Sequence, residues 1–425
     1  MMALKNPRFM PRLRFPEFRE TEEWEPRTLG RIGEFIGGGT PNTSIPEYWG
    51  GDIQWFTPSE INKRNLSKSK RTITSEGLKH SSAKKLPTGT LLLSTRATIG
   101  DVGIADNPCA TNQGFQSLVV FGHEVNVFWY YWLLLHKCEL IKRSSGSTFL
   151  EIGKTELKQI PILRPSKDEQ QKIADCLGSL DDLIAAEDRK LETLRQHKQG
   201  LMQQLFPQHG ESIPRLRFPE FRDAPAWREV SLGTLLVRAP DYGVNAPAVP
   251  FSKTLPTYIR ITDINSDGRF APCPRVSVNV ETDEDRYLKN GDIVLARTGA
   301  SVGKSYRYRE EDGRLIYAGF LIRVRPHPKR LLSQFLAAYL LTRNYWDWVR
   351  LTSVRSGQPG INSAEYASMS VSLPPNGINL TEQQKIAHFL KSLDDLIVAR
   401  SRKIEALMQH RQGLLQQLFP NQETE

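Results

Sequence analysis

The chain has 425 residues, more than one ordinary domain needs and enough to build two or more hydrophobic cores. Its composition, 39% apolar and 24% charged, is typical of a globular protein and argues against a disordered one. The sequence holds no run of 18 uncharged apolar residues, which argues against a membrane span, and no secretory signal is expected at its basic start. The formal net charge of +10 suits a polyanionic partner.

The four cysteines are scattered along the chain and form neither a Cys-x-x-Cys pair nor a Cys/His set with zinc spacing. We therefore expect reduced thiols in a cytoplasmic protein, with no metal site. These cysteines are Cys109, Cys138, Cys176 and Cys273.

The sequence contains an internal repeat that begins near its N-terminus. The segment Pro11–Arg19, which reads PRLRFPEFR, returns unchanged as Pro214–Arg222, and Trp24 matches Trp227. Further along, both halves carry the blocks EQQKIA, SLDDLI and QQLFP in the same order. The first copies of these blocks begin at Glu169, Ser179 and Gln203, and the second copies at Glu382, Ser392 and Gln416.

Between these repeated ends the two halves diverge, and only weak similarities remain. Gly89–Leu93 matches Gly291–Leu295, and we align Gly114-Phe115 with Gly319-Phe320. A constant frame with divergent surfaces favours a protein that reads two different half-sites. Two equal active sites would instead repeat their catalytic residues.

A long helix is predicted at the end of each half. Ser166 and Glu169 form a capping-box pattern, and Thr381 is predicted to be the N-cap of the second copy. No proline interrupts either segment until Pro207 and Pro420. The first helix, from about residue 168 to 206, would be roughly 55 Å long at ~1.5 Å per residue.

Apolar residues in both helices recur in steps of four and three, which is the period of a coiled-coil seam. Two polar breaks fall at the same places in both copies, Glu187 and Lys198 in the first, Arg400 and Arg411 in the second. We predict an antiparallel pair whose polar breaks help to set the register. The alternative is that each helix packs on its own domain as an ordinary amphipathic helix. The predicted seam comprises Ile173, Leu177, Leu180, Ile184, Leu191, Leu194, Leu201 and Leu205, then Ile386, Leu390, Leu393, Ile397, Ile404, Leu407, Leu414 and Leu418.

The divergent stretches mix short β-rich runs with helical segments, so each half is predicted to be an α+β domain. Strands are expected at residues 90–94, 117–121 and 158–162. Helices are expected at residues 127–142 and 331–349, whose aromatic residues we assign to core packing. Polar and basic side chains, of the kind that bond base edges and phosphates, concentrate in the connecting loops.

Neither half of the sequence contains a recognisable catalytic motif. Ala300–Ser305 resembles a phosphate-binding loop, but Thr298 stands where the first glycine is required, so we expect a structural turn there. The chain has no Asn-Pro-Pro-Tyr or Asp-Pro-Pro-Tyr tetrapeptide of the kind that amino-methyltransferases use, and no His-Glu-x-x-His. The sequence therefore predicts recognition without catalysis in this chain.

The doubled PRLRFPEF segment with its tryptophan, and the doubled EQQKIA, SLDDLI and QQLFP blocks, resemble the specificity subunit of Type I restriction–modification enzymes over the whole length. The resemblance implies two target-recognition domains, joined by helices that set the gap between the halves of a bipartite, asymmetric DNA site. It also implies double-stranded DNA, modification subunits (two of them) and restriction subunits as partners. S-adenosylmethionine, ATP and Mg²⁺ would be bound by those partners and none by this chain.

On this interpretation the chain divides into a first target-recognition domain (1–165), a central helix (166–208), a second target-recognition domain (209–375) and a C-terminal helix (376–425). The residues expected to contact DNA lie on loops of both domains. In the first they are Thr40, Lys63, Arg64, Arg96, Gln113, Ser145, Ser147 and Thr148, and in the second Arg260, Thr262, Asn265, Arg297, Thr298, Arg355 and Gln358.

Two other readings of the sequence remain open. One is a scaffold whose two domains hold two protein partners, and the other is a standalone DNA-modifying enzyme whose motifs have diverged. Salt-dependent binding to duplex DNA would separate the first from a DNA reader, and turnover by the purified chain would support the second.

Overall fold

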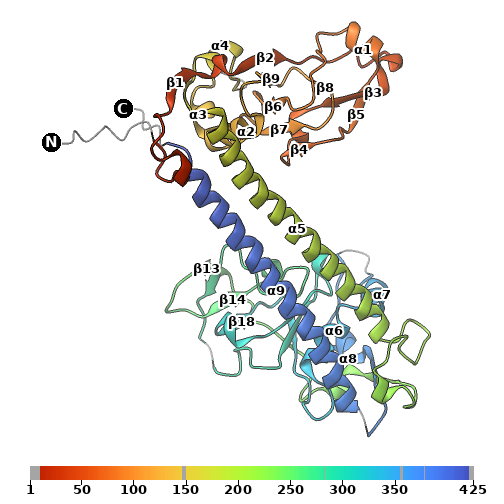
Figure 1. Ribbon diagram of the computed structural model, residues 1–425. Helices are drawn as coiled ribbons and strands as arrows, with labels where there is room; N and C mark the ends of the chain where they lie inside the picture. Colours follow the sequence, from red (N-terminus) through yellow and green to blue (C-terminus); the bar gives the residue numbers. More distant parts are fainter. Residues whose placement is uncertain (1–9, 146–149, 282, 355–357, 378, 421–425) are drawn as a thin grey trace, which may run out of the picture. The chain divides into compact units, whose positions relative to one another are not determined.

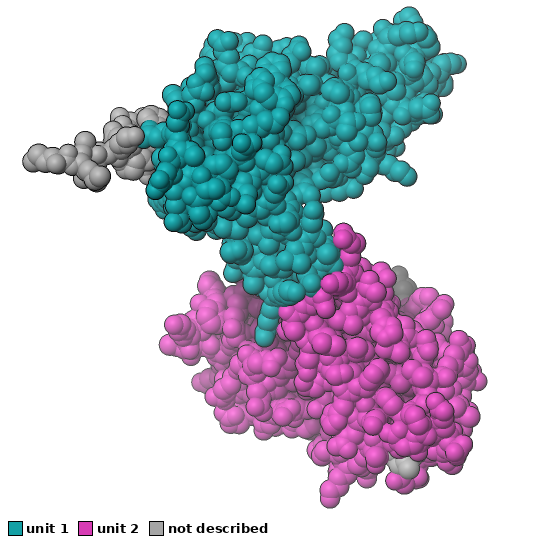
Figure 2. Space-filling model, viewed as in Figure 1, with its two compact units in different colours: residues 1–188, 402–425 teal, residues 189–401 magenta. Residues whose placement is uncertain are grey.

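The computed structural model describes residues 10–145, 150–281, 283–354, 358–377 and 379–420. They form two compact units, unit 1 from residues 1–188 and 402–425 and unit 2 from residues 189–401 (Figure 2). Two helices of 39 residues, α5 (Lys167–Leu205) and α9 (Asn379–Gln417), each begin in one unit and end in the other. The predicted pair of long helices and the α+β fold class are confirmed.

Unit 1 contains three small sheets, in the strand orders β1-β10, β2-β9-β6-β7-β4 and β5-β3-β8 (Figure 1). Its strands are β1 (Glu25–Thr28), β2 (Gly33–Gly37), β3 (Trp49–Phe56), β4 (Asn65–Leu66), β5 (Arg71–Ile73), β6 (Leu91–Leu93), β7 (Val102–Ala105), β8 (Cys109–Thr111), β9 (Gln116–Val120) and β10 (Pro161–Arg164). Its short helices are α1 (Ser75–Lys79), α2 (Asn126–Leu135), α3 (Lys137–Lys142) and α4 (Lys154–Gln159).

Unit 2 repeats this plan with the sheets β11-β20, β12-β19-β16-β17 and β13-β15-β14-β18. Its strands are β11 (Arg228–Ser231), β12 (Asp241–Tyr242), β13 (Ala248–Pro250), β14 (Thr257–Ile259), β15 (Val276–Val278), β16 (Ile293–Ala296), β17 (Ser305–Arg307), β18 (Leu315–Tyr317), β19 (Leu321–Val324) and β20 (Ser370–Leu373). Its short helices are α6 (Ser333–Tyr339), α7 (Arg343–Thr352) and α8 (Ser363–Ser368).

The same strand pairings recur in both units. β3 pairs with β8 in parallel in unit 1, and β14 pairs with β18 in parallel in unit 2, while β2-β9-β6-β7 matches the antiparallel order β12-β19-β16-β17. Gly89 and Gly291, two residues before β6 and β16, both have a positive φ, which a residue with a side chain rarely adopts. The divergent sequences therefore fold on one framework.

Several local predictions were wrong in detail. Residues 158 and 159 end helix α4, and only from Pro161 does the predicted strand form, because the N-terminal part of the segment continues a helical turn. The two predicted recognition-domain helices are each broken into two, α2 with α3 and α6 with α7. Their aromatic residues are mostly buried, but Trp346 is exposed.

The start of α5 is capped as the sequence predicts, yet its glutamate has another partner. The backbone N–H of Glu169 donates to Ser166 Oγ (3.3 Å). Both carboxylate oxygens of Glu169 accept from Arg14, at 2.8 Å and 2.7 Å, in a buried bidentate pair. In unit 2 the equivalent Arg217 binds Glu382 at 2.8 Å and 2.9 Å, and both are buried. Helix α9 begins at Asn379, so Thr381 lies inside its first turn, and the prediction that it is the N-cap was wrong.

The next residue of each repeated block anchors its helix to the recognition domain. Gln170 Oε1 accepts from the backbone N–H of Val125 just before α2 (2.9 Å), and Gln383 Oε1 accepts from that of Leu332 just before α6 (2.8 Å). Both glutamines are fully buried. A buried amide left without partners would be costly, so these bonds fix where each helix starts against its domain.

The repeated opening segment also contacts the end of the other long helix. The N–H of Leu13 donates to Gln417 O near the end of α9, and the N–H of Leu216 donates to Gln204 O near the end of α5, both at 2.9 Å. An aromatic pair accompanies each bond. Trp24 meets Phe419 edge to face at 6.2 Å in unit 1, and Trp227 meets Phe206 in the same way at 6.1 Å in unit 2.

Within each unit the two helices are held together by cross-helix ion pairs at the polar breaks of the seam. In unit 1 Arg411 Nη1 lies 2.7 Å from Asp181 Oδ1, and in unit 2 Lys198 Nζ lies 2.7 Å from Asp394 Oδ1. In unit 1 Lys403 also binds Glu187. Residue numbers rise along α5 as they fall along α9, so the helices run antiparallel there. None of the predicted seam residues or polar breaks is exposed.

We expect Glu382→Ala to lower the free energy of unfolding by about 3–5 kcal/mol, because Arg217 would remain buried without its counter-charge. Urea denaturation followed by tryptophan fluorescence would measure it. The matched control is Lys385→Ala, which removes the half-exposed pair of Lys385 with Glu220 and should cost less than about 1 kcal/mol. Equal effects of the two substitutions would contradict a special role for the buried pair.

We expect Asp394→Lys to destabilise unit 2, because it places a third cation beside Lys198 and Arg269, and Lys198→Asp in the same chain to recover part of the loss. Both partners are partly exposed, so the coupling energy from a double-mutant cycle should be only about 0.5–1 kcal/mol. The exposed pair Lys391–Asp395 on α9 serves as the control. A coupling no larger than that of the control would mean that the cross-helix pair does not help to set the register.

Candidate nucleic-acid interface

In unit 1, three loops that the sequence assigned to DNA contact lie together at the ends of strands β6 and β9. The N–H of Thr95, just after β6, donates to Gly114 O, just before β9 (2.8 Å). Thr40 Oγ1 lies 2.6 Å from Gln113 Oε1, which joins the glycine-rich loop after β2 to the same place. Both Thr40 and Gln113 are exposed, so their polar atoms remain accessible to a ligand.

The loop after α3 joins this surface through Glu151. Arg96 Nη2 lies 2.7 Å from Glu151 Oε2, and Ser145 exchanges two backbone hydrogen bonds of 2.9 Å with Glu151. The guanidinium and the carboxylate are both at least one-third exposed. Arg96 therefore stands at the surface with a carboxylate that a phosphate could displace. Ser147 and Thr148 lie outside the described residues.

The remaining two candidates of unit 1 lie elsewhere. Lys63 is exposed beside β4, whereas Arg64 is committed to helix α5, with Nη2 2.6 Å from Asp182 Oδ1. Tyr131 Oη donates to Asp181 on the same helix (2.6 Å). Burial is the main cause that raises the pKa of Tyr131, and the bond to Asp181 is the second. The geometry of Arg64 favours a role in attaching the domain to α5 over one in contacting DNA.

In unit 2, Arg297 occupies the position after β16 that Thr95 occupies after β6. Its guanidinium carbon lies 4.7 Å from the ring centre of Tyr242 at the end of β12, within the range of a cation–π contact. Tyr242 Oη accepts from the N–H of Ser363 (3.2 Å). Hydrogen bonding to Ser363 and, to a smaller extent, the charge of Arg297 lower the pKa of Tyr242.

Two further candidates join Arg297. Thr298 forms a β-bridge with Gly360, as Arg96 does with Glu151 in unit 1. The N–H of Gly299 donates to Pro359 O (3.0 Å), which brings the neighbouring Gln358 to the same loop. The structure thus brings together Arg297, Thr298 and Gln358, and Arg355 lies outside the described residues.

The other candidates of unit 2 form a separate loop after β14. Arg260 is paired with Asp263 (2.8 Å), Thr262 is exposed, and Asn265 Oδ1 accepts from the backbone N–H groups of Asp267 and Arg269. These bonds shape the loop itself. Arg269 Nη2 lies 3.7 Å from Asp394 on α9, so the loop leads back to the helix.

Strand pairing corrects one alignment made from the sequence. Ser94 bridges Phe115 in unit 1, whereas Ala296 pairs with Leu321 in unit 2, so Leu321 and not Phe320 is the equivalent of Phe115. Gly114 is then the equivalent of Phe320, as the matching bonds from Thr95 N–H and Arg297 N–H to their carbonyls show. The aligned Gly-Phe dipeptides are one residue out of register.

Two residues of this surface were missed by the sequence, Tyr242 and Phe320. Both are exposed aromatics, and both stand where unit 1 has glycine, since Tyr242 pairs with Ile322 as Gly37 pairs with Gln116. The sequence alignment matched Phe320 with Phe115, which is buried, and therefore gave no reason to expect Phe320 at the surface. An aromatic residue beside a turn is too common in sequences to have identified either.

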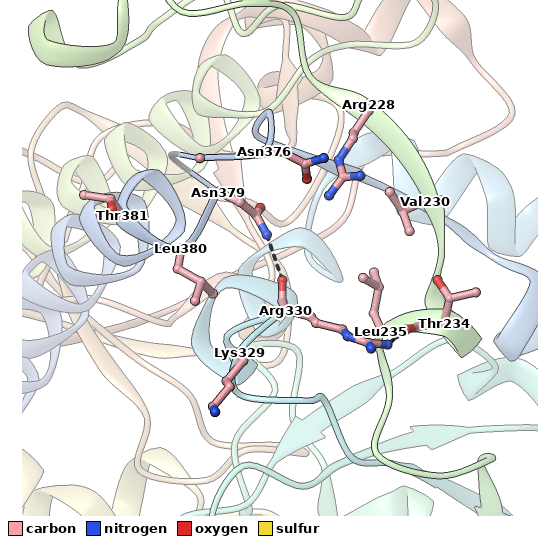
Figure 3. A pocket seen from close by; sticks show the side chains of 11 residues that line it. Arg228, Val230, Thr234, Leu235, Lys329, Arg330, Asn376, Asn379, Leu380 and Thr381 are labelled. Atoms are coloured by element: carbon pink, nitrogen blue, oxygen red, sulfur yellow. Dashed lines mark hydrogen bonds between the residues drawn. The ribbon is translucent and has the colours of Figure 1, made fainter.

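A separate cavity of about 510 Å³ opens in unit 2 beside the start of α9 (Figure 3). Arg228, Lys329 and Arg330 line it, and none of its eleven described lining residues is acidic. Asn379 Nδ2 donates to Arg330 O (3.0 Å), and Arg330 Nη1 donates to Thr234 O (2.9 Å), which holds the guanidinium at the wall. The cavity is suited to an anionic group.

Within the described ranges, no group of three or more His, Cys, Asp or Glu side chains is arranged to hold a metal ion. None of the helices in these ranges is long and apolar enough to cross a membrane. Gly299–Ser301 forms one 3₁₀ turn between β16 and β17, so the segment that resembled a phosphate-binding loop is a structural turn.

Comparison with protein families gives one match, which covers most of the chain. The family described as the Type I restriction modification DNA specificity domain matches residues 21–196 and again residues 253–409. The first copy covers the strands of unit 1 and most of α5, whereas the second begins after β13 and covers the rest of unit 2 and most of α9. The two copies correspond to the two halves of the internal repeat.

Similar individual proteins carry specificity-subunit names. The MjaIX specificity subunit of Methanocaldococcus jannaschii is 40% identical over 201 residues, 44% of this chain and 46% of that protein. The EcoR124I/EcoR124II specificity subunit of Escherichia coli is 28% identical over 174 residues, 39% of this chain and 43% of that protein. The chain thus spans about half the length of these two relatives.

A solved structure extends the likeness in fold to nearly the whole chain. The S subunit of a Type I restriction–modification system from M. genitalium matches with a TM-score of 0.59 at 18% identity. The match covers 97% of this chain and 99% of that one.

Proposed function

The chain belongs to the Type I restriction modification DNA specificity family, and from that premise we propose that it is a non-catalytic DNA-recognition subunit. It reads a bipartite, asymmetric site, one half-site with each unit. It thereby directs adenine methylation and restriction by partner subunits that carry the chemistry. The family match provides a DNA specificity domain in each half, and the proposal adds the kind of site and the division of labour with the partners.

The observation that carries the proposal is a shared framework with different side chains at equivalent loop positions. The same three strand ends carry Gly37, Gly114 and the buried Thr95 in unit 1. In unit 2 they present Tyr242, Arg297 and Phe320. A protein with two identical tasks would keep these positions alike, whereas a reader of two different base sequences must vary them.

The proposed protein partners are two modification subunits and the restriction subunits, with S-adenosylmethionine, ATP and Mg²⁺ bound by those partners. Each long helix offers one exposed leucine at the same place of the SLDDLI block, Leu183 on α5 and Leu396 on α9. An exposed leucine is common on its own, but its repetition beside the buried seam supports one equivalent docking contact per helix.

The test is single-molecule sequencing of methylated bases in cells that carry the modification partner, with and without this chain. We expect N6-methyladenine at one split motif, two short specific blocks around a fixed gap, only when the chain is present. If the chain is folded and expressed and no motif depends on it, the proposal fails, and a protein-interaction scaffold becomes the better reading. Methylation by the purified chain alone would instead indicate a standalone enzyme.

We expect Arg297→Ala to relax one base position of the half-site read by unit 2, at a cost of about 1–3 kcal/mol for the correct base. The measurement is the affinity of the assembled complex for duplexes that differ at each position of that block. Arg343→Ala, an exposed arginine of α7, is the control. An equal loss for all sequences, with a smaller salt dependence, would make Arg297 a phosphate contact.

A further inference from the structure

Phe320 is the most exposed phenylalanine among the large hydrophobic residues that the structure describes, with 59% of its surface accessible. It immediately precedes β19, and its carbonyl accepts from the N–H of Arg297 (3.0 Å), so its backbone is held by the sheet. The ring therefore stands on a rigid base and not on a long loop. Exposing so large an apolar ring to water gains nothing for the fold.

The surroundings of Phe320 are suited to nucleic acid. Tyr242, 39% exposed, ends the neighbouring strand β12 and carries the guanidinium of Arg297 over its ring. Two exposed aromatic rings at the ends of neighbouring strands, with an arginine over one of them, combine base-stacking surfaces with a positive charge that favours nucleic acid. Thr298 and Gln358 add hydrogen-bonding groups at the same place.

Unit 1 lacks this arrangement, and at the position of Phe320 the reason is steric. A Cβ at Gly114 would lie 2.8 Å from Pro58 Cγ, so the position cannot hold a side chain without a shift of the neighbouring loop. The equivalent position of Tyr242 is Gly37, also without a side chain. The aromatic rings are thus a feature of the second recognition surface alone, on a framework that both units share.

We propose that Phe320 stacks against a base that has come out of its stack in the half-site read by unit 2, with Tyr242 and Arg297 holding the adjacent backbone and base. The inference rests on the proposed function and deepens it. Apolar side chains that insert at a base step replace the lost base–base stacking with base–ring stacking, and the duplex bends at that step. Unit 1 has glycines at these positions and offers no ring for such a contact.

The experiment uses the complex assembled with the modification subunits and duplexes that carry 2-aminopurine, whose fluorescence rises on unstacking, at each position of both blocks. The target adenines are expected to give a rise whatever residue stands at 320, because methyltransferases take their target base out of the stack. We expect one further position of the second block, and none of the first, to give a rise that depends on Phe320. Phe320→Ala should abolish that rise and weaken binding about 5- to 150-fold, since a stacked base contributes about 1–3 kcal/mol by alanine substitution. Phe320→Tyr, which keeps the ring, should retain both.

Phe251→Ala is the matched control, because Phe251 is also an exposed phenylalanine of unit 2, 46% accessible, yet it lies beside Arg275 in another loop. It should change neither readout. An unchanged melting temperature of Phe320→Ala, expected for an exposed side chain, would exclude misfolding as the cause.

Three outcomes would overturn the inference while the proposed function stands. One is Phe320→Ala that binds and methylates the split motif as well as the unchanged chain. Another is that Phe320→Ala weakens binding although the unchanged chain gives no fluorescence rise that depends on Phe320. If replacing a thymine with uracil weakened binding of the unchanged chain to the same extent, Phe320 would be a contact to a thymine methyl in an intact stack. The third is loss of the modification subunits from the complex, which would make it a protein contact. Failure of the proposed function would show differently, as no split motif at all.

Discussion

Each unit is organised around a buried bidentate ion pair between the repeated opening segment and the first turn of a long helix, Arg14 with Glu169 and Arg217 with Glu382. Buried pairs of this kind contribute little net stability compared with an apolar pair, but removing one partner is very costly. They therefore specify an arrangement more than they stabilise it. Here the pair fixes where the opening segment lies, and that segment in turn bonds to the end of the other helix.

Because each opening segment bonds to the end of the other long helix, neither half of the sequence supplies the whole core of a unit by itself. The core of unit 1 contains Leu415, Leu418 and Phe419 from the far end of the chain. The core of unit 2 likewise contains Met202, Leu205 and Phe206 from the helix that begins in unit 1. The repeated segments are thus the residues by which the end of each long helix packs into the core of the other unit. Their side chains pack tightly in these cores, so substitutions in either copy are expected to disturb the packing of both units.

The variable residues are free to differ because the framework does not depend on them. Arg297 joins the strands through its backbone N–H group and Phe320 through its carbonyl, so neither side chain takes part in the strand pairing. The ring of Phe320 is exposed and the side chain of Arg297 is half-buried, so both are available for recognition, whereas the equivalent Thr95 is buried and Gly114 has no side chain. Arg64 and Arg269 show the limit of that freedom, since they lie in divergent loops but reach the aspartates of the helices, and they attach the domain to its helix.

The sequence by itself determined the internal repeat, the α+β class, the two long helices and the seam, because these depend on periodicity and on letters repeated in order. It could not identify the buried partners of Glu169 and Glu382, which lie more than 150 residues away along the chain. Only the tertiary structure separated Arg64 and Arg260, which are committed to holding the domain and its loop in shape, from Arg96, whose ion pair with Glu151 is exposed, and Arg297, which lies over the ring of Tyr242. The tertiary structure alone also corrected the alignment of the two units by one residue and showed that Phe320 is the equivalent of Gly114. The reason is that strand pairing, and not the similarity of the residues, decides which positions are equivalent.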